Sequence, residues 1–141
     1  MIGEILQERG YVSAENLRTA IEYQKTSPEL YIGEILIRLG FLDEIDIVTA
    51  LVLQCNLPYI AISKYKVDEE VIRLIPADVA WRNRVVPLDR IGSVLSVVMS
   101  SPVEEAFRDE MERLTGCTIA MFISTSSEIS AALSRFYSSK D

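Results

Sequence analysis

The first 54 residues of this chain contain the same pattern twice. Residues 1–24 read MIGEILQERGYVSAENLRTAIEYQ and residues 31–54 read YIGEILIRLGFLDEIDIVTALVLQ, so the two copies align at an offset of 30 residues. A repeat this regular predicts two copies of one supersecondary unit, which either stack on each other or grip one symmetric ligand. Six positions carry the pattern: Gly3, Leu6, Gly10, Leu17, Ile21 and Gln24 return as Gly33, Leu36, Gly40, Ile47, Leu51 and Gln54.

Each copy is predicted to form two short helices. Gly10 and Gly40 follow helical apolar patterns, at the position where a glycine ends a helix. Ser13 and Asp43 stand where an N-cap would begin the next helix. The second helix of the second copy is apolar nearly all round, which predicts that it is buried at the centre of the helical module.

A second module is predicted from residue 58 onward, and from residue 84 the period of the apolar residues changes from the 3.6 of a helix to the 2 of a strand. Residues 59–66 look like an extended link. Ile91-Gly92 is the expected hairpin turn between two β-branched runs. The third strand is expected to lie parallel to the second, because a helix connects them. The predicted strands are about 84–90, 93–100 and 117–124, and the predicted helices about 68–74, 77–83, 103–115 and 126–137.

The fold class predicted from these patterns is α+β. A tandem-repeat four-helix module, residues 1–57, precedes a small module, residues 58–141, with a three-stranded mixed sheet and flanking helices. A hydrophobic fraction of 49% supports a globular chain.

Composition argues against several functions. The net charge is −7, with nine acidic and four basic residues in 1–54, so general binding to DNA or RNA is not expected. The chain has no histidine and no G-x-x-x-x-G-K-[ST] loop, which removes an imidazole base and an ATPase phosphate loop. We therefore expect no enzyme activity, no catalytic residue, no bound metal and no cofactor. Glu4 and Glu8 interrupt any leader-like apolar run, and direct membrane insertion is not expected.

On these residues the chain resembles the N-terminal domain (MshEN or GspE N-terminal type) of the motor ATPases of type II secretion and type IV pilus assembly. The family pattern runs R-L-G-x-x-L-x3-G-x6-L-x3-L-x2-Q, and its second copy lacks the arginine. The later segments VIRLIPADVAWRNRVVPLDRIGSVLSVVMSSP and TGCTIAMFISTSSEISAALSRFY also resemble the family, so the resemblance covers nearly the whole chain.

The resemblance implies a candidate ligand, because a subset of this family binds cyclic di-GMP. Taken singly, the glycines at the helix starts favour close packing between helices, and each glutamine favours a solvated helix end. The leucines and isoleucines, taken singly, favour ordinary core positions. Their joint recurrence favours a duplicated half-site for a two-fold symmetric ligand, with the two glutamines as polar contacts to guanine. The implied site residues are Ile2, Gly3, Leu6, Gly10, Leu17, Ile21, Gln24, Ile32, Gly33, Leu36, Gly40, Ile47, Leu51 and Gln54.

One position departs from the family pattern. Met1 stands where the family has an arginine that is expected to contact guanine or phosphate. Losing charge-assisted hydrogen bonds worth roughly 1.5–3 kcal/mol each would weaken affinity by about ten- to a hundredfold.

Two functional hypotheses from different classes follow. In the first, the chain is a regulatory domain in which cyclic di-GMP clamps the two repeats together. In the second, it binds no nucleotide and is a protein–protein adaptor that docks a motor ATPase to an inner-membrane platform protein. A purely structural cap in a larger chain is a third. Each hypothesis implies a cytoplasmic location, peripheral at the inner membrane through a partner. If the chain is a fragment, an ATPase domain is expected to follow it; if it is complete, it is expected to act on a partner in trans.

Overall fold

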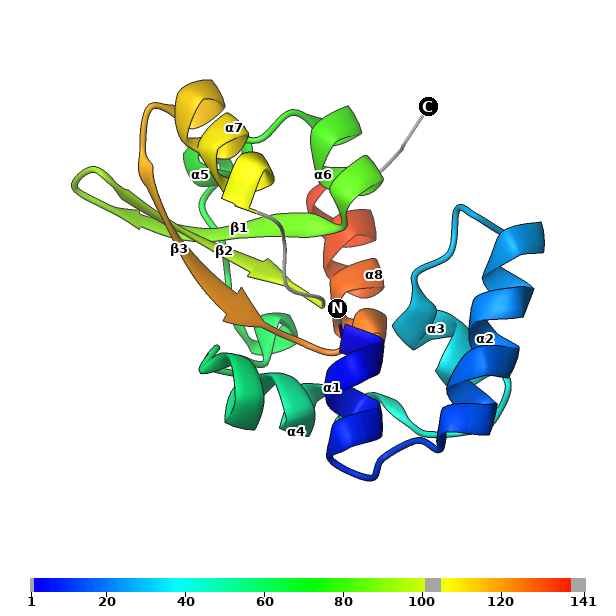
Figure 1. Cartoon of the computed structure of the whole chain (residues 1–141). Helices are drawn as coiled ribbons and strands as arrows, with labels where there is room; N and C mark the ends of the chain where they lie inside the picture. Colours follow the sequence, from blue (N-terminus) through cyan, green and yellow to red (C-terminus); the bar gives the residue numbers. More distant parts are fainter. Residues whose placement is uncertain (1, 101–104, 138–141) are drawn as a thin grey trace. The chain divides into compact units, whose positions relative to one another are not determined.

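The computed structural model describes residues 2–100 and 105–137 of the chain. The chain divides into two compact units, residues 1–56 and residues 57–141. Figure 1 shows the helical first unit in blue to blue-green and the mixed second unit in green to red. Met1 and the expected helix start at residue 103 lie outside the described residues.

The first unit contains the two predicted helix pairs, one in each repeat. In this unit α2 packs against α3, α4 packs against α1, and α1 also contacts α3. The second helix of each repeat therefore packs on the first helix of the other repeat. The helices are α1 (Ile2–Glu8), α2 (Ala14–Thr26), α3 (Ile32–Arg38) and α4 (Glu44–Cys55).

The first helix of each repeat ends in the same way. Gly10 and Gly40 have φ values of +80° and +79°, the left-handed region that a side chain disfavours. The N–H of the residue after each glycine donates to the carbonyl of Leu6 or Leu36, at 2.9 and 3.0 Å, and the glycine N–H donates to the carbonyl three residues back. These are the two hydrogen bonds of a Schellman motif. The predicted helix stops are confirmed.

The second helix of each repeat begins at the predicted N-cap. Ser13 Oγ accepts a hydrogen bond from the N–H of Asn16 at 3.1 Å. Asp43 and Asp46 form a reciprocal capping box, in which each carboxylate accepts from the other residue's N–H. Local hydrogen bonding therefore sets the start of α2 and α4.

The prediction that α4 lies buried at the centre of the module is wrong. Ile47, Ala50 and Leu51 are buried, but Ile45 is 63% exposed and Leu53 is 68% exposed. The apolar residues outnumber the positions that one contact face can cover, since α4 packs mainly against α1.

The second unit contains a three-stranded mixed sheet in the order β1-β2-β3. β1 and β2 pair antiparallel, and β2 and β3 pair parallel with Leu95 opposite Ile119. The predicted mixed sheet and its parallel pair are confirmed. The elements are a 3-10 helix η1 (Ile62–Lys64), α5 (Glu69–Ile72), α6 (Ala77–Asn83), β1 (Val85–Ile91), β2 (Val94–Met99), α7 (Glu105–Thr115), β3 (Thr118–Ile123) and α8 (Ser126–Phe136).

Two local predictions in this unit need correction. Ile91 pairs with Val94, so the hairpin turn is Gly92-Ser93 and not Ile91-Gly92. Gly92, at φ +60°, occupies the first turn position, where positive φ is required. The helix expected over 68–74 is α-helical only over Glu69–Ile72, and the Asp68 side chain makes no capping hydrogen bond.

A β-bulge interrupts β1 after Pro87. The pairing register shifts between Pro87 and Asp89, so Leu88 has no partner on β2. Four consecutive residues of β1, 85–88, are buried, and the three residues that follow them are exposed. The alternating sequence pattern did not predict this irregularity.

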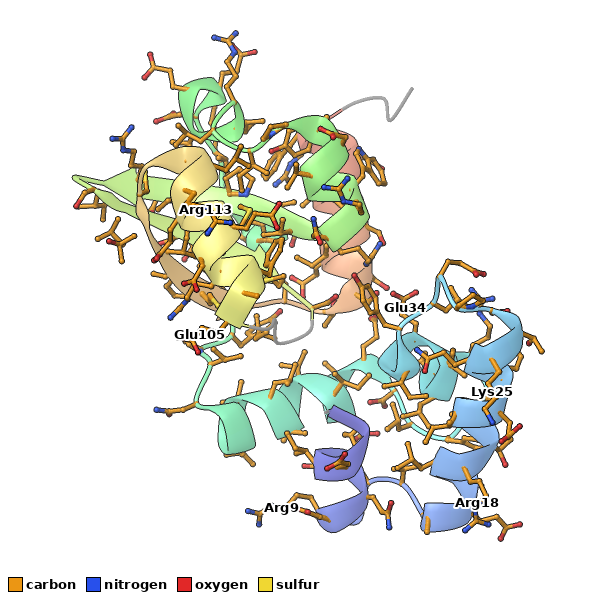
Figure 2. The ribbon with its side chains drawn as sticks, turned by 45° about the horizontal axis from the view of Figure 1, so that its top comes forward. Arg9, Arg18, Lys25, Glu34, Glu105 and Arg113 are labelled. Carbon is orange, nitrogen blue, oxygen red and sulfur yellow. The ribbon has the colours of Figure 1, made fainter. Side chains whose placement is uncertain are left out.

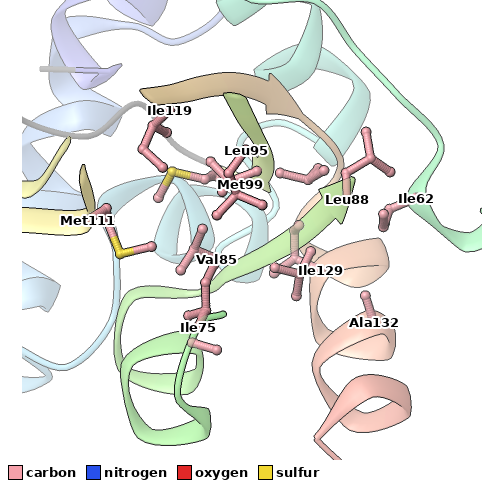
Figure 3. Close-up of a cluster of buried hydrophobic side chains, with 14 of the residues drawn as sticks. Ile62, Ile75, Val85, Leu88, Leu95, Met99, Met111, Ile119, Ile129 and Ala132 are labelled. Carbon is pink, nitrogen blue, oxygen red and sulfur yellow. The ribbon is translucent and has the colours of Figure 1, made fainter. Parts of the chain in front are cut away.

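The core of the second unit gathers side chains from strands and helices. Ile75, Val85 and Ile129 come from the α5–α6 loop, β1 and α8, and Met111 joins them from α7 (Figure 3). α5, α6 and α8 contact β1, whereas α7 contacts β3. Among the helices of residues 2–100 and 105–137, none is long and apolar enough to cross a membrane.

Candidate ligand site in the helical repeats

Most apolar residues of the repeated motif lie in the core of the first unit. Leu6, Leu36 and Leu51 have no exposed surface. The other buried members, Leu17, Ile32 and Ile47, are 6%, 6% and 8% exposed. Burial at these positions accounts for their recurrence by packing alone, so their first role is to fix the geometry of the two helix pairs.

The motif glycines serve two different purposes. Gly10 and Gly40 are exposed helix stops, and a Cβ built on either would meet nothing within 4 Å. Gly3 and Gly33 are buried instead. A Cβ on Gly33 would lie 3.0 Å from Ile47 Cδ1, so this glycine lets α3 approach α4 closely.

The two copies differ at one apolar position. Ile21 on α2 is 37% exposed, whereas its repeat equivalent on α4, Leu51, is completely buried. The sequence pattern alone treats them as equivalent. Ile21 is therefore the apolar motif residue that the structure leaves most accessible among those whose side chains it describes.

Gln24 links the two repeats. Its Nε2 donates a hydrogen bond to the backbone carbonyl of Leu30 at 2.9 Å, in a partly buried position. This contact ties the end of α2 to the residue that precedes Tyr31, the N-cap of α3. Gln54 and Ile2 belong to α4 and α1, and their side chains lie outside the described part of the structure.

One accessible aromatic residue in this region was missed by the sequence analysis. Tyr31 is 38% exposed and directly precedes the second motif. It occupies the position equivalent to Met1 at the 30-residue offset, and that offset was the available signal. An exposed aromatic ring beside Gln24's hydrogen-bond partner adds a surface on which a flat base could stack.

Basic side chains of the first repeat lie on the outside of the first unit. Arg9, Arg18 and Lys25 are exposed and point outward in Figure 2. Lys25 pairs with Glu22 at 2.9 Å, with both side chains well exposed. Such exposed pairs contribute little to stability. Within the described residues, no group of three His, Cys, Asp or Glu side chains could hold a metal ion.

The second unit contains a hollow of about 490 Å³ between α5, the start of α6 and the end of α8. Tyr137 lines it, and its hydroxyl donates to the carbonyls of Ile72 and Ile75 at 3.0 and 2.9 Å. Burial raises the pKa of this phenol well above its ordinary value. Arg135 also lines the hollow, but its guanidinium donates to three backbone carbonyls. This arrangement is structural.

Comparison with known proteins matches both units. The sequence profile of the MshEN domain family matches residues 55–141. The chain is 31% identical over 139 residues to the type IV pilus assembly ATPase PilB of Myxococcus xanthus, and 26% identical over 139 residues to PilB of Thermus thermophilus. It aligns over 99% and 96% of its own length but spans only 24% and 15% of these relatives.

Solved structures show the same fold. A structure of MshE with cdg (cyclic di-GMP) has a TM-score of 0.75 and 29% identity, covering 97% of this chain and 99% of that one. The N-terminal domain of XpsE has a TM-score of 0.76 at 20% identity, covering 96% and 92%. The predicted α+β fold class and the resemblance inferred from the sequence are confirmed.

Proposed function

The chain belongs to the MshEN domain family, and on this premise we propose that it is a non-catalytic regulatory domain that binds cyclic di-GMP between its two repeats. Its output would act on a motor ATPase of type II secretion or type IV pilus assembly. The domain would work in the cytoplasm, at the inner membrane only through a partner protein.

The observation that carries this proposal is the packing of helices from one repeat against helices from the other. Each second helix packs on the first helix of the other copy, and both first helices end in the same Schellman motif. Two helix pairs related in this way would offer two half-sites to a ligand that is itself two-fold symmetric. The match to MshE with cdg adds support at 29% identity.

The proposed contacts divide into three kinds. Gln24 and Gln54 would read guanine edges through an amide that both donates and accepts. Ile21 would supply apolar contact, since it keeps 37% of its surface exposed. The remaining motif residues would shape the site from behind by packing or by ending helices. They are Ile2, Gly3, Leu6, Gly10, Leu17, Ile32, Gly33, Leu36, Gly40, Ile47 and Leu51.

Calorimetric titration of cyclic di-GMP into the purified chain tests the proposal. We expect saturable binding near one ligand per chain, no binding of GTP, and affinity lost in Gln24→Ala and Gln54→Ala. Gln7→Ala is the matched control, because Gln7 is an exposed glutamine on α1 outside the motif. No heat at high micromolar ligand, or equal weakening by the control, would contradict the proposal.

An adaptor function is the second candidate, and a specific surface favours it. Ile45 and Leu53 are 63% and 68% exposed and lie eight residues apart on α4, so they share one face over two turns. Exposed apolar side chains gathered on one face favour docking to a protein. The proposed partner is an inner-membrane platform protein.

Variants separate the two candidates. Ile45→Ser with Leu53→Ser should weaken binding to the cytoplasmic part of a platform protein and leave the cyclic di-GMP titration unchanged. Gln24→Ala with Gln54→Ala should have the opposite effect. An adaptor function is contradicted if the α4 variant binds the platform protein as tightly as the wild type.

A further inference from the structure

Residues 58–65, which we call the strap, overlap the segment 59–66 that was predicted to be an extended link, but they are hydrogen-bonded along their length to the rest of the second unit. The strap follows Asn56, the left-handed C-cap of α4 at φ +56°, and Leu57, where the second unit begins. It includes η1. Its bonds reach β3, the loop after β3, and both ends of α8.

The first part of the strap extends the sheet. The N–H of Ile123 donates to the carbonyl of Pro58 at 2.8 Å, and the N–H of Ile60 donates to the carbonyl of Ile123 at 2.8 Å. Tyr59 and Ile123 form a parallel bridge. The end of β3 therefore has a short neighbouring segment that comes from the junction between the units.

The middle of the strap is held by a buried hydroxyl. Ser124 has no exposed surface. Its Oγ donates to the carbonyl of Ile60 and accepts from the N–H of Ile62 at 3.4 Å. Ile62 is itself fully buried in the core of this unit. A buried hydroxyl with both bonds made fixes the path of the strap.

The strap also contacts the first and last turns of α8. The Tyr59 hydroxyl donates to Glu128 Oε1 at 2.8 Å, and the same carboxylate oxygen accepts from the N–H of Thr125, the N-cap of α8. At the other end, Arg135 donates to the carbonyls of Ile62, Ser63 and Tyr65, each at 3.3 Å. The strap and α8 are thereby connected across about two turns of helix.

We propose that the strap is a relay that carries a change in the helical repeats to α8, with Tyr59 and Arg135 as positioning residues. The covalent path from the repeats enters the second unit at Leu57 and continues into the strap. A displacement of the strap must then either move α8 or break its bonds at Glu128 and Arg135. The change that the relay would carry rests on the proposed binding of cyclic di-GMP to the repeats. The hydrogen bonds between the strap and α8 are independent of that proposal.

Hydrogen exchange of the full chain without ligand tests the bonding. We expect the amides of Ile60 and Ile62 to be protected together with those of α8. Tyr59→Phe should speed exchange in the strap and α8 by roughly two- to tenfold, as expected for one lost hydrogen bond. Arg135→Ala should speed it at least as much, because it removes three hydrogen bonds. Tyr65→Phe is the control, because Tyr65 accepts from Arg135 through its backbone carbonyl. Strap amides that exchange as fast as an unstructured linker would overturn the proposal.

The same measurement with saturating cyclic di-GMP tests the relay. We expect the ligand to change exchange in the strap and in α8 of the wild type and of Tyr65→Phe. In Tyr59→Phe with Arg135→Ala, the change should persist in α2 and α3 and be lost in α8. Ligand binding with no change in α8 of the wild type would overturn the relay. Absence of binding would instead contradict the proposed function, and the ligand-free measurement would still test whether the strap is bonded to α8.

Discussion

Gly33 lies against Ile47 so closely that a Cβ on the glycine would stand 3.0 Å from Ile47 Cδ1. The contact joins α3 to α4 within one repeat. The helix-stop glycines of the same motif make no such contact. Glycine suits position 33 because a neighbouring side chain leaves little room for a Cβ, whereas positions 10 and 40 favour glycine because their backbone has a positive φ.

Substitutions at Gly33 should therefore depend on side-chain size. An alanine Cβ would crowd Ile47 Cδ1, but this atom is the flexible end of a side chain and can move away. Alanine also favours the helix over glycine by up to about 1 kcal/mol, which offsets the remaining cost of the contact. We expect Gly33→Ala to change the free energy of unfolding by less than about 1 kcal/mol, and Gly33→Val to destabilise by about 1–3 kcal/mol. Urea unfolding of both variants checks this, and equal losses would contradict it. Ile47→Val should reduce the cost of the valine if the contact is the cause.

Gly10→Ala and Gly40→Ala should each destabilise by about 1–2 kcal/mol, although nothing fills the space beside either glycine. The cost comes from the left-handed backbone, which Cβ disfavours. Gly10→Asn and Gly40→Asn serve as controls, because asparagine tolerates this conformation and should lose less. Thermal or urea unfolding gives the comparison. An alanine variant as stable as the wild type would mean that the Schellman turns are not formed in solution.

The equivalent residues Ile21 and Leu51 should respond differently. Leu51→Ala removes a completely buried side chain and should cost about 2–5 kcal/mol of stability. Ile21→Ala should cost clearly less, because its side chain is 37% exposed, while weakening cyclic di-GMP affinity if the proposed site is correct. Unfolding and calorimetric titration on the same two variants separate the effects. Equal destabilisation would contradict the asymmetry between the repeats.

Tyr137 should make the second unit sensitive to alkaline pH. Burial raises the pKa of its phenol in the folded chain above the ordinary value near 10. The folded state thus holds this proton more tightly than the unfolded state, so the associated stability is fully present below about pH 10 and is lost as pH rises above it.

Tyr137→Phe should remove this alkaline dependence. The variant leaves the carbonyls of Ile72 and Ile75 without the phenol and should lose about 1–3 kcal/mol at neutral pH. Its stability should then fall less between about pH 9 and pH 11 than that of the wild type. Tyr65→Phe, at a tyrosine that is 47% exposed, is the control. A slope equal to the wild type's would exclude Tyr137 as its source.

Features decided by neighbours in the sequence were predictable. Ser13 and Asp43 were both identified as N-caps, because a cap depends on a few adjacent residues and leaves a local signature. The stops at Gly10 and Gly40 followed for the same reason. The mixed sheet was predictable, although its hairpin turn was placed one residue too early, because the turn and the connecting helix are both short-range features.

Features decided by distant residues were not predictable. The bond from Tyr59 to Glu128 spans 69 positions, so nothing near residue 59 distinguished the strap from a linker. The bulge after Pro87 depends on its partner strand. Likewise, the repeat gave Ile21 and Leu51 the same pattern, and only the packing of α2 and α4 made one exposed and the other buried.

The strap has a consequence for how other proteins can recognise the second unit. A β-sheet edge normally offers free backbone groups to an incoming strand. Here one edge, β3, has Ile123 paired with the strap and the N–H of Ile119 donating to the Glu112 carboxylate at 3.0 Å. The other edge, β1, carries Pro87, which has no N–H, followed by the bulge. Strand addition is therefore disfavoured on both sides, and we expect a partner of this unit to bind helices, loops or side-chain surfaces.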